Sequence, residues 1–306
     1  MAALDEHIAF SVFRLLVMVV SLVGNAVTLF VIVSYEKIRG QGANILFAQL
    51  AVADFILGIG AGARGVSTIV FHQFGLTSHR KGLCLALGSP TVFGIHLSQT
   101  TMVTIAFDRF LCVRFPIFYR HLECSHFLLL RCALCVFYSS LGTAASYLGV
   151  AFEAEVEICS TGTAITSWYS VYWLIFSTVL TIVIYIAYIA IFVLFRRQSS
   201  AAFGKSTTQK ALFATTTAVL VSYFVCWCIR NVLFVVFKQT DSSKTLIGYV
   251  GVLTGVGGAL SSTTNIFIYG WKHPDMRCQL KKILGGLTGT TSVGAVNVQL
   301  QDVTVK

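Results

Sequence analysis

Residues 44–71 read NILFAQLAVADFILGIGAGARGVSTIVF, a long apolar run with only two charged side chains, Asp54 and Arg64. A helix needs about 20 apolar residues to cross the hydrocarbon core of a bilayer. Because lipid cannot satisfy free backbone groups, this run is expected to be a transmembrane helix. The same reasoning predicts seven spans, at about residues 8–34, 44–71, 82–113, 126–150, 168–195, 208–237 and 246–271. The predicted fold class is an all-α membrane protein, a seven-transmembrane helix bundle.

The composition agrees with a chain embedded in lipid. Of its 306 residues, 56% are hydrophobic and 11% are charged, whereas soluble domains carry about 25% charged residues. A net charge of +10 can indicate nucleic-acid binding, but here Lys and Arg lie in short loops between apolar runs. That placement is typical of the cytoplasmic face of a membrane. We therefore expect the lipid bilayer, and no nucleic acid, as a partner.

Loop charges also predict the orientation. With the N-terminus outside, the inner segments carry twelve Lys and Arg residues and the outer loops carry four, in agreement with the positive-inside rule. We expect a multi-pass protein of the plasma membrane with a cytoplasmic C-terminus. The first run is too long for a signal peptide and follows Asp5 and Glu6, so it is expected to be a retained helix. Residues 272–284 are expected to form an amphipathic helix on the inner leaflet, and residues 285–306 a disordered tail.

Asp54 is the only acidic residue deep within the apolar runs, apart from Asp108 near an inner end. An Asp at mid-membrane costs about 2.5–3.5 kcal/mol on insertion scales, so its side chain must face partners inside the bundle. Two interpretations are open at this point. Asp54 is either a polar residue that its neighbours satisfy, or part of an ion or proton site.

Short motifs follow one another along the chain: Gly24-Asn25, Leu50-Ala51-Val52-Ala53-Asp54, Asp108-Arg109-Phe110, Cys226-Trp227 and Asn265-Ile266-Phe267-Ile268-Tyr269. In this order they resemble the helix signatures of rhodopsin-like (class A) G-protein-coupled receptors, over residues 8 to about 284. The chain departs from that pattern because helices 4 to 7 contain no Pro. With this departure, three further segments resemble the nematode serpentine receptor class SX chemoreceptors: Lys81-Gly82-Leu83-Cys84, Gly88-Ser89-Pro90 and Ser98-Gln99-Thr100.

The resemblance implies that a ligand binds from outside and that a heterotrimeric G protein responds inside. Asp108 would hold Arg109 at rest, and activation would free Arg109; the alternative is a simple interfacial ion pair. The residues implied in G-protein coupling and activation are Asp108, Arg109, Phe110, Tyr188 and Tyr269. The implied hinge beneath the ligand is Tyr223, Cys226 and Trp227, for which plain aromatic packing is the alternative. The implied polar core, with an allosteric sodium ion at Asp54 as the expected cofactor, is Asn25, Asp54, Ser98, Ser261, Ser262 and Asn265.

The resemblance also implies a disulfide. Cys84 opens helix 3, and receptors of this kind bond that Cys to one in the second outer loop, where Cys159 is the only Cys. Such a bond forms in the oxidising secretory lumen and would hold the loop over the bundle; the alternative is two unpaired thiols. Cys278, after helix 7, is either a palmitoylation site or a plain free thiol.

The ligand pocket carries an unusual charge. Thr91 stands where amine receptors place an Asp, so a cationic monoamine is not expected. Arg64 and Arg230 should open into the cavity because an Arg facing lipid is costly, and guanidinium groups bind carboxylates in pairs of hydrogen bonds. We predict an acidic ligand, such as a peptide carboxylate or small organic acid. The alternative is that these arginines pair with Glu153, Glu155 or Glu157, or snorkel to water. The predicted pocket comprises Arg64, Thr91, Ile95, His96, Trp227, Arg230 and Asn231.

Three other functions make different demands on the sequence. A transporter or channel should show more paired ionisable residues along one path, and broken helices. An intramembrane enzyme needs a nucleophile with a base, or two facing acids, and the sequence shows neither. A receptor-like protein that does not signal remains open because the missing prolines put the helix 6 movement in doubt.

Overall fold

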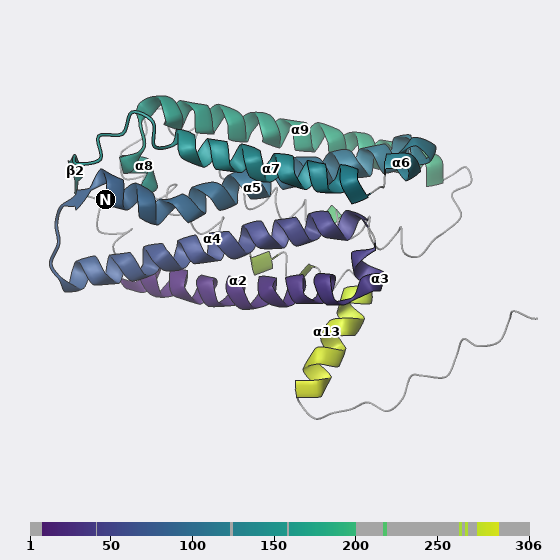
Figure 1. Cartoon of the computed structure of the whole chain (residues 1–306), viewed down its shortest axis with the longest axis horizontal. Helices are drawn as coiled ribbons and strands as arrows, with labels where there is room; N and C mark the ends of the chain where they lie inside the picture. The colour runs from purple at the N-terminus through teal and green to yellow at the C-terminus, as the bar shows by residue number, and fades with distance from the viewer. Residues whose placement is uncertain are drawn as a thin grey trace, which may run out of the picture.

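Figure 1 shows a computed structural model of the chain, which describes residues 8–40, 42–122, 125–157, 159–199, 217–218, 263–264, 267–268 and 274–287. The long helices are α2 (Ile8–Ser34), α4 (Gly42–Gln73), α5 (Lys81–Arg114), α7 (Ser125–Ala145) and α9 (Ser167–Ser199). The shorter elements are α3 (Glu36–Arg39), α6 (Pro116–Leu122), α8 (Thr161–Ala164), α13 (Pro274–Leu287), β1 (His79–Arg80) and β2 (Glu155–Val156).

The five long helices run side by side, and α5 is the central one (Figure 1). It packs against α4, α7 and α9, while α4 packs in turn against α2. Strands β1 and β2 pair antiparallel near α8 at one end of the helices, and α3, α6 and α13 lie toward the other end. We call these the outer and the inner end, following the orientation predicted from the loop charges.

Four helices in the described part of the chain are long and apolar enough to cross a membrane. They are α2, α4 from Asn44, α7 from His126, and α9 as far as Leu194. Helix α5 is not among these four because its sequence is more polar, with His96, Ser98 and Gln99 buried in its middle. A helix surrounded by other helices can carry such residues, since they face protein rather than lipid.

Each of the first five predicted spans overlaps one long helix, but the prediction for 126–150 is wrong at its end. Helix α7 stops at Ala145, and residues 146–149 form turns. Gly149 has a φ of +75°, a conformation that glycine adopts without steric cost. The spans expected at 208–237 and 246–271 lie outside the described residues, apart from helical pairs at 217–218, 263–264 and 267–268.

Small residues bring α2, α4 and α5 close together, as is usual for helices in lipid. A Cβ atom at Gly58 would lie 2.9 Å from the Cβ of Ser21, and one at Gly94 would lie 2.8 Å from the side chain of Leu57. Within helices, hydroxyl groups donate to the carbonyl four residues earlier, at Thr28, Ser89, Thr104, Ser139 and Thr143. These bonds satisfy polar side chains without water.

Helix α13 overlaps the predicted amphipathic helix but differs from it in two respects. It runs to Leu287, three residues into the segment predicted to be a disordered tail. An amphipathic helix on the leaflet would turn apolar residues such as Met276 and Leu280 toward the acyl chains, but both pack against the apolar core cluster that contains Val31, Phe47 and other inner-end residues. Apolar surface on this helix is therefore buried against protein, while Arg277, Lys281 and Lys282 are exposed.

Candidate functional site

A buried charged cluster lies at the inner end of α5; we call its members, Asp108, Arg109, Tyr119 and Arg131, the Asp108 cluster. The Asp108 side chain is 1% exposed, and each arginine side chain is 12% exposed. Arg109 donates to Oδ2 of Asp108 from Nε at 3.1 Å and from Nη2 at 2.5 Å. Arg131 donates from Nη1 to Oδ1 at 2.9 Å, and the Tyr119 hydroxyl lies 3.2 and 3.1 Å from Oδ1 and Oδ2. Both carboxylate oxygens are thus satisfied without water.

Three elements bring the Asp108 cluster together. Helix α5 ends at Arg114, and Pro116 begins α6, a position that suits proline because the first helical amide needs no partner. This short helix places Tyr119 over Asp108. Arg131 comes from α7, where its guanidinium lies 4.8 Å from the ring centroid of Phe127, one turn earlier. That contact is a cation–π interaction that fixes the arginine's direction.

Two further predicted residues flank the Asp108 cluster. Phe110, the third residue of the motif, is half-buried on α5. Tyr188 on α9 packs against the inner apolar core, and its buried hydroxyl has no hydrogen-bond partner among the described residues. It lies close enough to Arg109 and Asp108 to interact with both electrostatically. The coupling role of Tyr188 stays a prediction.

The outer end is tied covalently. Cys84 at the start of α5 and Cys159 before α8 form a disulfide with their Cα atoms 5.1 Å apart, so this prediction is confirmed. Both cysteines are buried in a small apolar cluster with Leu85, Val150 and Ala164. The connecting segment also pairs as β2 with β1, which holds it over the helix ends.

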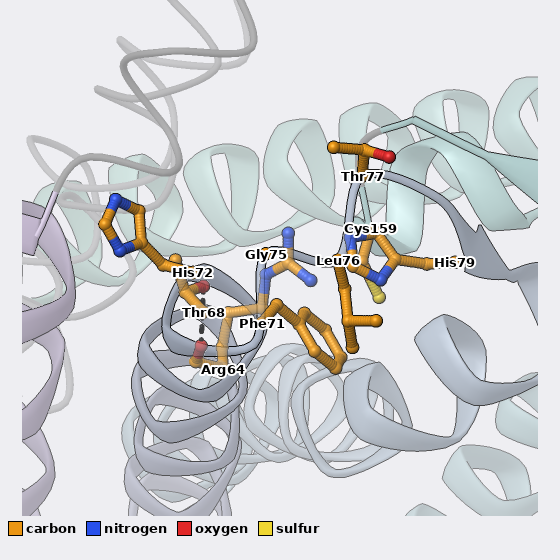
Figure 2. Close-up of a pocket in the computed structure, with 9 residues that line it drawn as sticks. All are labelled: Arg64, Thr68, Phe71, His72, Gly75, Leu76, Thr77, His79 and Cys159. Carbon is orange, nitrogen blue, oxygen red and sulfur yellow. Dashed lines mark hydrogen bonds between the residues drawn. The ribbon is translucent and has the colours of Figure 1, made fainter.

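An outer pocket of about 320 Å³ opens beside this tie, between α4 and the segment before β1. Figure 2 shows Arg64 in the middle of the pocket, with His72 and His79 on opposite sides of it. The lining residues are Arg64, Thr68, Phe71, His72, Gly75, Leu76, Thr77, His79 and Cys159. Among the described residues, this lining includes an arginine and two histidines and no acidic side chain. It therefore suits an anionic group.

Two of the loop glutamates that were predicted as alternative partners of Arg64 and Arg230 make other contacts. Glu153 forms an exposed ion pair with Arg80 at 3.0 Å. Glu155 accepts a hydrogen bond from the Ser78 hydroxyl at 2.6 Å.

His96 lies in a separate aromatic cluster between α5, α7 and α9. Its ring is fully buried against Trp173 and Phe176, with centroids 4.9 and 5.1 Å away. Its Nε2 lies 3.1 Å from the hydroxyl of Tyr169, which in turn donates to the carbonyl of Gly142 at 2.8 Å. The structure therefore does not bring His96 into the outer pocket with Arg64.

The other described members of the predicted ligand pocket lie elsewhere on α5. Thr91 packs directly against Gly60 of α4, and Ile95 packs against the inner apolar core. Trp227, Arg230 and Asn231 lie outside the described residues.

Comparison with known protein families identifies the family of this chain. Residues 18–284 match the family described as "Serpentine type 7TM GPCR chemoreceptor Srsx". The chain belongs to the Srsx family. The resemblance drawn from the sequence motifs is thereby confirmed. As an Srsx member the chain is a multi-pass membrane protein and a receptor of the G-protein-coupled type, not an enzyme.

A weaker likeness points the same way. A segment of 95 residues is 28% identical to prokineticin receptor 2 from Bos taurus. The aligned part covers 31% of this Srsx chain but only 24% of the length of that receptor. It supports the receptor class and no more.

The described half of the polar core is buried within the Srsx bundle. Asp54 is 1% exposed, and Ser98 is buried as well. Ser21, which the sequence reasoning did not select, donates to the Asp54 carbonyl at 2.8 Å and accepts from Asn25 at 3.2 Å. The Ser21 bond reaches the backbone oxygen of Asp54, and sodium at its carboxylate stays a prediction. The remaining predicted members, Ser261, Ser262 and Asn265, lie outside the described residues.

Arg131 is the functional candidate that the sequence reasoning missed. Nothing in its own run marks it, since it stands alone in an apolar stretch of α7. The sequence did offer one signal, the free-energy cost of an arginine within a membrane span. Such an arginine pairs with another polar group, and Asp108 is near the same end of the bundle. Cys278 is exposed on α13, which leaves both palmitoylation and a free thiol open. The predicted hinge, Tyr223, Cys226 and Trp227, and the predicted coupling residue Tyr269 lie outside the described residues.

Proposed function

We propose that this Srsx receptor passes the binding of an extracellular ligand with an acidic group to a heterotrimeric G protein, with Arg109 as the contact. The Asp108 cluster is the observation that carries the proposal. Asp108 and Arg109 form a buried ion pair at the inner end of the central helix. An arginine so placed is tolerated only while it is paired, so a movement of α5 against its neighbours can exchange its partner.

The outer pocket supports an acidic ligand. Its volume of about 320 Å³ lies at the lower limit of small-molecule sites. It therefore suits the acidic group of a small ligand or the carboxylate end of a longer one. Arg64 lines the pocket together with His72 and His79, and a guanidinium group can bind a carboxylate through two parallel hydrogen bonds.

The membrane arrangement belongs to the same proposal. We take the chain to cross the plasma membrane seven times with its N-terminus outside, which sets the outer pocket in the extracellular medium and the Asp108 cluster toward the cytoplasm. We also take sodium to bind at the buried carboxylate of Asp54 and to stabilise the resting arrangement, as the resemblance to rhodopsin-like receptors implies.

Paired ligands test the acidic-ligand part. A set of small organic acids and peptides, each beside its uncharged amide, is applied to cells that express the receptor, and second messengers are recorded. Acids should activate wild type at least about tenfold more potently than their amides, since a charge-assisted pair is worth about 1.5–3 kcal/mol. Arg64→Gln should remove this difference. Arg80→Gln is the matched control, because Arg80 pairs with Glu153 instead of lining the pocket, and equal potency of acid and amide on wild type would contradict the proposal.

Arg109→Ala separates a signalling receptor from a receptor-like protein that does not signal. One observation favours a receptor-like protein that does not signal, namely the absence of Pro from residues 126–271. Signalling that disappears in Arg109→Ala at unchanged surface expression supports coupling through Arg109. An identical response in both proteins supports a receptor-like protein that does not signal.

A further inference from the structure

Arg131 and Arg109 share one carboxylate. Arg109 holds Oδ2 of Asp108, and Arg131 holds Oδ1 at 2.9 Å. They approach from different helices, Arg109 from α5 itself and Arg131 from α7. The two arginines therefore do not occupy the same position, and either can keep its bond when the other moves away.

Because two arginines share Asp108, its charge stays paired when one of them leaves. The Asp108 cluster holds one carboxylate and two guanidinium groups, and the Asp108 side chain is 1% exposed. If Arg109 were its only cation, release of Arg109 would leave a buried unpaired carboxylate, which is strongly unfavourable. With Arg131 in place, the carboxylate keeps a charged partner throughout, and Tyr119 keeps a hydrogen bond to it.

We propose that Arg131 is a positioning residue that retains Asp108 when Arg109 is released, and so lowers the free-energy cost of activation. This inference rests on the proposed function, in which Arg109 leaves Asp108 to contact the G protein. Arg131 also competes with Arg109 for Asp108 at rest, which weakens the resting ion pair. Both effects act in the same direction and favour the state with Arg109 released.

The surroundings of Arg131 suit this role. The ring of Phe127 lies under its guanidinium at 4.8 Å, so the side chain is oriented by its own helix. Its contact with Asp108 is made through a single nitrogen, Nη1. A change of the Arg109 side-chain rotamer that withdraws it from Oδ2 can thus leave the Arg131 bond to Oδ1 in place.

Two other roles predict different outcomes. If Arg131 only fastened α5 to α7 in the resting state, its removal would ease activation. If it were purely structural, its removal would lower stability and leave the G-protein affinity of the folded receptor unchanged. The sign of the change in affinity therefore separates the three roles.

The test measures the dissociation constant between purified receptor in nanodiscs and a panel of nucleotide-free G-protein heterotrimers of the main α-subunit classes. The proteins compared are wild type, Arg109→Ala, Arg131→Gln, Arg131→Lys, Asp108→Asn and the double variant Asp108→Asn/Arg131→Gln. Each is first checked for a monodisperse elution profile. If Arg131→Gln is not recovered folded, Arg131→Met, which keeps the apolar stem against Phe127, replaces it with the same expected result.

We expect Arg131→Gln to bind the best G protein at least about tenfold more weakly than wild type, and Arg131→Lys to stay within about threefold of it because the charge is kept. In the Asp108→Asn background the same Gln substitution should change the affinity less than about twofold, since no carboxylate remains to be paired. Equal or tighter binding by Arg131→Gln overturns the inference. Wild type that binds no tighter than Arg109→Ala overturns the proposed function itself, and the inference with it.

Discussion

The outer and inner ends of the bundle are fastened by different chemistry. At the outer end the Cys84–Cys159 disulfide joins α5 to the second outer segment, and the Arg80–Glu153 pair beside it is exposed by 69% and 80%. At the inner end no covalent bond is present among the described residues, and the helices meet at Asp108, which is 1% exposed. The outer tie is permanent, whereas the inner one can exchange partners.

This difference indicates how a signal can travel along α5. The helix is 34 residues long, about 50 Å at 1.5 Å per residue, so it reaches from one end to the other. Helix α5 is fixed by a disulfide at its outer end and held by exchangeable hydrogen bonds and ion pairs at its inner end. A small tilt of α5 beside the outer pocket can therefore change the side chain with which Arg109 pairs. The variants described next test how much each end contributes to stability, and whether the contacts at the inner end can exchange.

Loss of the disulfide should have the largest effect on stability. The bond closes a separation of 75 residues, for which a chain-entropy argument gives about 4 kcal/mol. Cys84→Ala should lower the free energy of unfolding by an amount of that order, measured as a fall in Tm in detergent. Cys278→Ala is the control, because Cys278 is exposed outside the disulfide, and the same Tm for both variants would mean that the outer tie adds little.

Removing the inner carboxylate should have the next largest effect. Asp108→Asn leaves Arg109 and Arg131 side by side without their charged partner, and breaking such a buried pair costs about 3 kcal/mol. Unlike the disulfide variant, it should also raise ligand-independent signalling, because Arg109 is freed. Tm and basal second-messenger levels are measured on the same samples. Lower stability with unchanged basal signalling would mean that the inner tie is structural only.

Removing a hydrogen bond from the aromatic cluster around His96 should lower the free energy of unfolding by an intermediate amount. Tyr169→Phe removes the hydroxyl that bonds His96 Nε2 and the Gly142 carbonyl, and leaves both buried groups with one partner fewer. We expect a loss of about 1–2 kcal/mol in unfolding free energy. Tyr172→Phe, which removes a bond to the half-buried Tyr138, should cost less. Denaturation monitored by Trp fluorescence compares the two, and the reverse order would contradict the contacts described here.

Loss of the exposed ion pair at the outer end should have the smallest effect on stability and signalling. Glu153→Gln removes the charge that faces Arg80, yet exposed pairs contribute less than about 1 kcal/mol. Its Tm should match wild type within error, and signalling should be unchanged. A loss comparable with that of Asp108→Asn would remove the contrast between the two ends.

Much of the fold followed from the sequence because lipid imposes a simple rule. Long apolar runs must be helices, and the first five predicted spans overlap the five long helices. The end of α7 was misplaced because residues 146–150 continue the apolar pattern, whereas residues 146–149 form turns, with Gly149 at positive φ. Hydropathy records composition and carries no information on such a turn.

The candidate site was predictable where a motif marked it. Asp108, Arg109, Cys84 and Cys159 were found in this way, and the disulfide is present. Arg131 was missed because its role depends on α7 lying beside the end of α5, which no local pattern encodes. The aromatic neighbours of His96 were not foreseen for the same reason, since its helix position alone did not show that it faces α7 and α9.

In the proposed function, Arg109 contacts the G protein once it is released from Asp108. The rate of nucleotide exchange that the purified receptor stimulates in a panel of G proteins tests this contact, with Asp108→Asn compared with Asp108→Asn/Arg109→Ala. We expect the single variant to stimulate exchange above wild type and the added Arg109→Ala to abolish the stimulation. Equal exchange rates for the two variants, at equal amounts of folded receptor, would contradict this contact.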